Sequence, residues 1–183
     1  MTGSMIRSRL SLALFPLLVF SVGIAAQAGA GEAILDFATG LFIEGDYELA
    51  AEEYSEFAGR YPDHPRAAEA HFRIGECMFR LELYERAAVS YRRALEHETL
   101  AASERAVALL RLGRVLAAVG QYQAAAGYYE RFISDFPEHG QIHEALYRVG
   151  DFLLGAGESE AAAEAFYTLF PTRRSSDHRK SVV

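Results

Sequence analysis

A tyrosine recurs along the chain at a nearly constant interval, and each copy lies in the same short pattern. Successive tyrosines are 37 and 38 residues apart, and each is followed by an alanine and then by a second tyrosine. The three copies are Tyr47-Ala50-Tyr54, Tyr84-Ala87-Tyr91 and Tyr122-Ala125-Tyr129, and a fourth keeps Ala162 and Phe166. Self-similarity at this period predicts an array of stacked helical units, in which each unit buries its hydrophobic face against its neighbours.

Each unit is expected to hold two helices. Their ranges are 32–43 and 47–60, 66–81 and 84–97, 103–119 and 122–135, and 141–154 and 158–170. Glycine after a helix tolerates the left-handed backbone of a sharp turn, and Gly45, Gly120 and Gly157 stand between paired helices. Asp46 is expected to cap the helix that follows it. These features predict an all-α fold, a right-handed α-α superhelix of about four helix-turn-helix units spanning 31–64, 68–101, 106–139 and 143–170.

Small residues fall at equivalent places in the two helices of every unit. The first helices contribute Ala38, Gly75, Gly113 and Gly150, and the second helices contribute Ala50, Ala87, Ala125 and Ala162. Since glycine inside a helix costs about 1 kcal/mol relative to alanine, its repeated use needs a packing reason. We expect the two sets to face each other and to let the paired backbones approach, while the recurring aromatic rings fill the space between neighbouring units.

The two ends of the chain do not follow the pattern. Arg7 and Arg9 precede an apolar run, and Ala26-Gln27-Ala28 supplies small residues at the positions a signal peptidase reads. Residues 1–28 are therefore predicted to be a secretory signal peptide, which makes the mature protein periplasmic or secreted and leaves it without stable membrane insertion. Residues 171–183 are polar and basic. This tail is expected to be disordered, and it resembles translated assembly or adapter sequence, so the natural chain is expected to differ beyond about residue 170.

The residue inventory excludes several kinds of activity. Without the six basic residues and one acidic residue of the two end segments, the body has 12 basic and 24 acidic residues, a charge near −12. Such a charge disfavours binding to nucleic acids and to anionic membranes. The sequence has no phosphate-binding loop, nucleophile elbow or triad pattern, so we predict no enzyme activity and no cofactor. His139 and His143 are spaced one turn apart but lack a visible third ligand, and no metal is predicted. Cys77 is the only cysteine and is expected to be buried.

The repeated pattern resembles the tetratricopeptide repeat family over about residues 31–170. Units two and three carry it most clearly, in Ile74-Gly75, Phe79, Tyr84, Ala87 and Tyr91 and in Leu112-Gly113, Gly120, Tyr122, Ala125 and Tyr129. Pro62 and Pro137 match the proline that ends a repeat of this family, whereas unit two has Thr99 there. The longer period and the aromatic-Pro-x-His links resemble bacterial envelope members, namely outer-membrane assembly lipoproteins of the BamD type and the repeat domain of the Tol–Pal-associated cell-division coordinator. The sequence has no cysteine after the signal segment for lipidation, which speaks against the first group. It has no coiled-coil segment before the array, which speaks against close kinship with the second.

The resemblance implies that the first helices line a concave groove that binds a peptide or helix. Carried over by register, the groove positions are Leu35, Thr39, Phe42, Phe72, Arg73, Glu76, Phe79, Arg80, Leu110, Arg111, Arg114, Tyr147, Arg148 and Asp151, with Ala117 and Leu154 beside them. Aromatic rings and arginines together suit a peptide ligand, because rings supply burial and arginine pairs with carboxylates. The alternative is that several rings are interior filler and that the arginines form a solvated rim.

These observations predict a non-enzymatic scaffold for protein–protein interaction in the bacterial cell envelope. The alternative is an accessory repeat region of a larger envelope enzyme, or a subunit of a secretion or assembly complex. A third alternative is self-association, because the final helix carries Phe166, Leu169 and Phe170 with no capping helix after it. The identity of the partner is left open.

Overall fold

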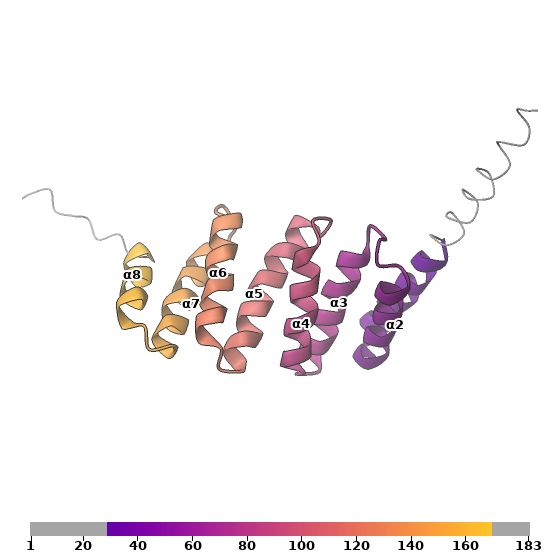
Figure 1. The fold of residues 1–183 in the computed structure, drawn as a ribbon, viewed down its shortest axis with the longest axis horizontal. Helices are drawn as coiled ribbons and strands as arrows, with labels where there is room; N and C mark the ends of the chain where they lie inside the picture. The colour runs from indigo at the N-terminus through magenta and orange to yellow at the C-terminus, as the bar shows by residue number, and fades with distance from the viewer. Residues whose placement is uncertain (1–28, 170–183) are drawn as a thin grey trace, which may run out of the picture.

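Eight helices follow one another through residues 29–169, the part of the chain that this computed structural model describes, and no strand occurs among them. The first helix covers residues 29–44. The others are α2 (Tyr47–Arg60), α3 (Ala67–Arg80), α4 (Tyr84–Glu96), α5 (Ala102–Ala118), α6 (Tyr122–Asp135), α7 (Ile142–Gly155) and α8 (Ser159–Leu169). The segments predicted to be a signal peptide and a tail lie outside the described residues. Figure 1 shows the helices side by side along one extended axis.

Consecutive helices pack in antiparallel pairs, and the pairs stack. Units one to four are the helix of residues 29–44 with α2, α3 with α4, α5 with α6, and α7 with α8, and each second helix also packs on the first helix of the next unit. The first helices α3 and α5 contact each other directly, whereas α4 and α6 share no contact of similar extent. The first helices therefore form the inner face of the array and the second helices its outer face. The predicted all-α solenoid is confirmed.

Between residues 29 and 169, no helix has both the length and the apolar character needed to cross a bilayer.

The turn inside every unit has the same hydrogen bond. A backbone N–H just beyond the first helix donates to a carbonyl five residues earlier, from Asp46 to Leu41 (3.0 Å), Leu83 to Met78 (2.9 Å), Gln121 to Leu116 (2.8 Å) and Glu158 to Leu153 (2.8 Å). This closure requires a left-handed residue. Gly45, Gly120 and Gly157 supply it with φ of 94°, 78° and 84°. The predicted Asp46 cap is wrong in its chemistry: Asp46 precedes α2, but its side chain makes no capping hydrogen bond.

Unit two has Glu82 where the other units have glycine, and Glu82 adopts a φ of 59°. In the left-handed conformation, a residue with a Cβ is about 1–2 kcal/mol less favourable than glycine. Part of this advantage of glycine is offset because glycine gives the unfolded chain more conformational freedom. We therefore expect Glu82→Gly to stabilise the protein by about 0.5–1 kcal/mol. Urea unfolding followed by circular dichroism measures the change. Gly120→Ala is the matched control and is expected to lower stability; a Glu82→Gly variant no more stable than wild type would contradict the assignment.

The turns that end units one and three are also alike. His64 and His139 follow a proline by two residues, and their rings lie edge-on against Phe57 and Phe132, with centroids 5.1 and 5.0 Å apart. The Nδ1 atom of each histidine accepts a backbone N–H two residues later, at 3.2 and 3.3 Å. The recurring aromatic-Pro-x-His sequence thus closes the link between units, and His139 has a structural role there.

Unit two ends differently, because its link lacks the proline turn. Arg105 of α5 reaches back and donates to the carbonyl oxygens of Leu95 (3.2 Å) and His97 (2.7 Å) at the end of α4. A guanidinium placed there satisfies carbonyls that the helix leaves without partners and complements the negative end of its dipole.

The packing reason for the helical glycines differs from the one predicted. A Cβ added at Gly113 would lie 2.4 Å from the ring of Tyr129, and one added at Gly75 would lie 2.7 Å from the ring of Tyr91. The nearest group is therefore an aromatic ring of the same unit, one turn beyond the alanine expected. Only at Gly113 is a backbone atom of the facing alanine, the Ala125 oxygen at 3.3 Å, among the nearest atoms. The rings therefore pack inside their own units, and Tyr129 also contacts Phe152 of unit four, with ring centroids 5.4 Å apart, as predicted for a ring between units.

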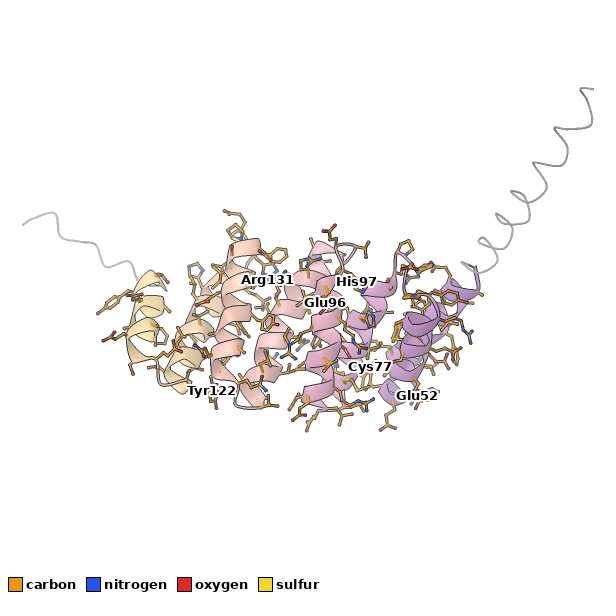
Figure 2. The ribbon with its side chains drawn as sticks, in the orientation of Figure 1. Glu52, Cys77, Glu96, His97, Tyr122 and Arg131 are labelled. Atoms are coloured by element: carbon orange, nitrogen blue, oxygen red, sulfur yellow. The ribbon has the colours of Figure 1, made fainter. Side chains whose placement is uncertain are left out.

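The buried core runs through the array, and Cys77, labelled in Figure 2, is fully buried within it. Burial, followed by the neighbouring Glu76 carboxylate, raises the pKa of the Cys77 thiol to about 12. The thiol therefore stays protonated and inert under ordinary conditions, as expected of a small buried apolar residue.

His71 and His97 approach each other where α3 meets the end of α4, with ring centroids 5.7 Å apart. Burial, followed by the charges of His97 and Arg93, lowers the pKa of His71 from 6.5, against the opposing effect of Glu96. As the pH falls below 6.5, His71 takes up its proton in the unfolded chain before it does so in the folded chain. Stability is therefore fully present above about pH 6.5 and falls as the pH drops toward the folded-state pKa.

We expect the wild-type protein to lose stability between neutral pH and about pH 5, and His71→Gln to lose less over the same range. Urea midpoints at the two pH values measure this difference, and carboxylate titrations common to both proteins cancel in the comparison. Equal losses in the two proteins would show that His71 does not titrate differently on folding.

Candidate functional site

Arginines and aromatic rings alternate along the inner face in a repeating arrangement. The guanidinium of Arg73 lies 5.9 Å from the ring centroid of Phe42, and that of Arg111, at the equivalent place in the next unit, lies 4.4 Å from Phe79. Each pair joins a first helix to the first helix of the unit before it. Arg148 occupies the same register in unit four, where Ala117 replaces the ring. Cation–π contact holds these side chains against the surface.

A buried carboxylate lies beneath this arrangement. Glu76 accepts a hydrogen bond from the Tyr91 hydroxyl at 2.5 Å, and the Nε of Arg111 lies 3.3 Å from the same carboxylate oxygen. Glu76 is 7% exposed and Tyr91 is fully buried. Burial, and next the Glu76 charge, raise the pKa of Tyr91, which keeps its hydroxyl protonated as a donor. A desolvated carboxylate held by one hydrogen-bond donor and one ion pair is a structural anchor between units two and three.

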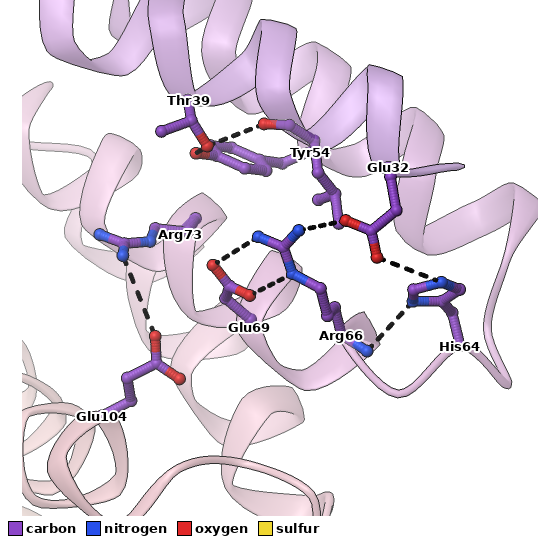
Figure 3. Close-up of polar contacts among 9 residues, drawn as sticks. Glu32, Thr39, Tyr54, His64, Arg66, Glu69, Arg73 and Glu104 are labelled. Carbon is purple, nitrogen blue, oxygen red and sulfur yellow. Dashed lines mark hydrogen bonds and ion pairs between the residues drawn. The ribbon is translucent and has the colours of Figure 1, made fainter. Parts of the chain in front are cut away.

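Unit one has a neutral version of the same anchor, shown in Figure 3. Thr39, which is equivalent to Glu76, lies 3.0 Å from the Tyr54 hydroxyl and also donates to the Leu35 carbonyl at 2.7 Å. Figure 3 also shows Arg66 between Glu32 and Glu69, and Arg73 reaching Glu104 at 4.0 Å. These ion pairs fix the side chains at the boundaries between the first three units.

The inner face is hollowed between units three and four. A pocket of about 210 Å³ there is lined by residues of α5, α6 and α7: Val107, Leu110, Arg111, Arg114, Tyr129, Gln141, Glu144 and Ala145. Arg114 is exposed and lies 5.5 Å from the Phe79 ring. Within residues 29–169 it makes no ion pair within 4.0 Å, unlike Arg73, Arg111 and Arg148. Burial raises the pKa of Tyr129, with Arg114 opposing that effect, so this pocket offers a protonated hydroxyl beside an uncommitted guanidinium.

The structure removes three of the predicted groove residues from the surface. Leu35 is fully buried, Phe72 is 5% exposed and Glu76 is 7% exposed, so none can contact a ligand without unfolding its unit. The reason is rotational: these positions point toward the paired second helix, where the aromatic rings cover them. Thr39 is half-buried and committed to Tyr54.

The remaining predicted positions are at least partly exposed. Phe42, Arg73, Phe79, Leu110, Arg111, Ala117 and Arg148 are half-buried, and Arg80, Arg114, Tyr147, Asp151 and Leu154 are exposed. Arg80 lies over the Tyr47 ring at 5.8 Å, and Arg148 pairs with Asp151 at 3.8 Å. The pocket brings together only Leu110, Arg111 and Arg114 from the predicted set. Whether any of them binds a ligand stays a prediction.

Sequence reasoning missed most of the pocket lining. The repeat pattern predicts Tyr129 as a ring that fills space between units, and not as a ligand contact. Gln141 immediately precedes α7, and Glu144 and Ala145 lie in its first turn. Register within one helix cannot show which turn of a neighbouring helix faces it, so the missing members had no clear signal.

The predicted self-association surface is only partly described. Phe166 packs inside its own unit, because a Cβ added at Gly150 would lie 2.5 Å from its ring, and Tyr147 stacks on it at 5.8 Å. The Leu169 side chain and Phe170 lie outside the described residues. Within residues 29–169, no three histidine, cysteine or acidic residues form a group that could hold a metal.

A family model described as tetratricopeptide repeat matches residues 35–103 and 110–177. The chain belongs to the tetratricopeptide repeat family. The interval between the two matched segments falls at the start of α5, beside the atypical link that follows unit two. Tetratricopeptide repeats stack into curved arrays whose extended surfaces bind other proteins, so the family assignment supports an interaction scaffold.

Solved structures show the same fold at low sequence identity. The crystal structure of MamA protein is 22% identical, with a TM-score of 0.63 over 87% of this chain and 82% of that one. MamA 41-end from Desulfovibrio magneticus RS-1 is 19% identical, with a TM-score of 0.57 over 80% and 77%. A tetratricopeptide repeat protein from Parabacteroides merdae ATCC 43184 is 20% identical, with a TM-score of 0.63 over 82% of this chain and 56% of that one. A comparison with curated proteins finds no match.

Proposed function

We propose that this tetratricopeptide repeat protein is a non-enzymatic scaffold of the cell envelope that binds an acidic peptide segment on its inner face. The observation that carries the proposal is the pocket between units three and four, where Arg114 has no ion-pair partner in the described residues and stands beside the Tyr129 ring. An arginine beside apolar and aromatic surface suits a peptide in which a carboxylate neighbours an apolar side chain.

The charge distribution favours such a ligand. The body of the chain has twice as many acidic as basic residues, yet four of its twelve arginines (Arg73, Arg111, Arg114 and Arg148) stand on the inner face. Three of them are balanced by Glu104, Glu76 and Asp151. Arg114, the fourth, is the cation at the pocket that a ligand carboxylate would neutralise, and the acidic body would repel acidic segments that miss it. Arg80 also makes no ion pair among the described residues, but it does not line the pocket.

The envelope location rests on the sequence alone. The apolar run after Arg7 and Arg9 and the small residues at Ala26 and Ala28 support export, and the kinship with envelope assembly or cell-division members remains part of the proposal. Expression of the full-length gene followed by cell fractionation tests it. Recovery of the protein in the cytoplasm, with residues 1–28 still attached, would contradict this part of the proposal.

A displayed peptide library selected on the full chain tests the inner face. We expect the enriched peptides to place aspartate or glutamate beside an apolar residue, and Arg114→Glu to weaken their binding by about tenfold or more, since charge-assisted contacts contribute about 1.5–3 kcal/mol. Arg131→Glu is the matched control, because Arg131 is exposed on α6 and pairs only with Asp135. Enriched peptides without acidic residues, or equal binding by the Arg114→Glu and Arg131→Glu variants, would contradict the proposal.

A further inference from the structure

A second groove lies on the outer face, between α2 and α4, and α3 forms its floor. Two adjoining cavities of 650 and 410 Å³ make it up, and both are lined by Ser55, His71, Ile74 and Arg93, so they are continuous. The α2 wall extends from Glu48 to Gly59, about 16 Å at 1.5 Å per residue. Figure 2 shows Glu52 near one end of this region and Glu96 and His97 near the other. We call this the outer groove.

The outer groove is apolar along its α3 floor and at two positions on its α4 side. Ile74 and Met78 of α3 form the floor, and Leu83 and Val89, which line the α4 side, are 39% and 46% exposed. Exposed Leu and Val beside an apolar floor provide a stripe that a partner could cover.

The two walls of the outer groove carry opposite charge. The α2 wall presents Glu48 and Glu52, and the α4 wall presents Arg86 and Arg93 along most of its length, with Glu96 at its far end. All five side chains are exposed. Across the described part of the chain, no ion pair within 4.0 Å involves any of them. The groove is therefore too wide for its own walls to neutralise each other, and both signs stay available to an occupant.

We propose that the outer groove docks an amphipathic helix that has an apolar stripe between one basic and one acidic flank. The spacing of the wall charges matches a helix better than an extended strand. Glu48 and Glu52 are one helical turn apart and Arg86 and Arg93 are two turns apart, so a helix lying along the groove can present partners at the same intervals. The groove length accommodates about three turns. Apolar burial on the floor supplies the attraction, and the two flanks select the partner.

Three fluorescent helix-forming peptides with the same leucine stripe test this: one with a lysine flank and a glutamate flank, one with two glutamate flanks and one with two lysine flanks. Anisotropy titrations with the full chain are expected to show the mixed peptide binding about fivefold or more tightly than either single-sign peptide, as two exposed ion pairs allow. In the Arg86→Glu, Arg93→Glu double variant both walls are acidic. The preference is then expected to move by about fivefold toward the two-lysine peptide.

The matched control is the Arg60→Glu, Arg131→Glu double variant, which has the same change in net charge at two exposed arginines that line neither the outer groove nor the inner-face pocket. It is expected to keep the wild-type preference, and circular dichroism confirms that both variants remain folded. Equal binding of the three peptides to wild type, or the same preference in both double variants, would overturn the proposal. Because neither control arginine lines the inner-face pocket, the comparison of the two double variants does not depend on the acidic peptide proposed above.

Discussion

Substitution of Gly113 by alanine is expected to destabilise the protein by about 1–3 kcal/mol, although alanine is the better helix former. The added Cβ would lie 2.4 and 2.5 Å from two ring carbons of Tyr129 and 3.3 Å from the Ala125 carbonyl oxygen. Tyr129 is itself buried and meets Phe152 edge-to-face, with ring centroids 5.4 Å apart, so the ring has little room to move. Chemical and thermal unfolding measure the loss.

Gly127→Ala is the matched control for this prediction. Gly127 lies inside α6, is exposed, and has no atom within 4 Å of the position that a Cβ would take. The same substitution there is expected to stabilise the protein by about 0.5–1 kcal/mol through helix propensity alone. The two substitutions should therefore move stability in opposite directions. Equal stability of the Gly113→Ala variant and wild type would show that the ring moves aside freely and that the glycine has no packing role.

Removal of the Tyr91 hydroxyl is expected to cost about 1.5–3 kcal/mol, the range for a hydrogen bond to a charged group. Tyr91→Phe leaves the Glu76 carboxylate, which is 7% exposed, with only the Arg111 contact at 3.3 Å. A buried carboxylate that loses this donor still bears the free-energy cost of leaving water, but it no longer has the hydrogen bond that offsets part of that cost. Urea unfolding near neutral pH is the measurement.

The repeat supplies two controls at equivalent positions. Tyr54 shares its hydrogen bond with the neutral Thr39 hydroxyl at 3.0 Å, so Tyr54→Phe should cost about 0.5–1.5 kcal/mol. The Tyr129 hydroxyl makes no hydrogen bond to another described residue, and Tyr129→Phe should change stability by less than about 0.5 kcal/mol. A similar loss in all three variants would mean that the ring environment, and not the carboxylate, sets the cost.

The repeat pattern predicts the helices well because helix period and turn chemistry are local. The expected ranges for α2 and α6 agree with the structure, and the glycine turns fall where the pattern requires. The same locality explains a failure: the repeat pattern does not mark Glu82, because its left-handed backbone follows from the closure of the whole turn. The repeat pattern predicts the exposed groove residues only in part. Leu35 and Arg114 occupy similar faces in their helices, yet one is fully buried and the other exposed.

By itself, the sequence determined the period, the helical units, the acidic body and the family, because these depend on spacing and residue type along one chain. Only the tertiary structure decided that the glycines face aromatic rings, that Glu76 is a buried anchor, and that Arg114 stands without an ion-pair partner in the described residues. Those outcomes depend on how each helix is rotated against its neighbours. A rotation of one residue, about 100°, exchanges a buried position for an exposed one, and spacing within a single helix cannot specify it.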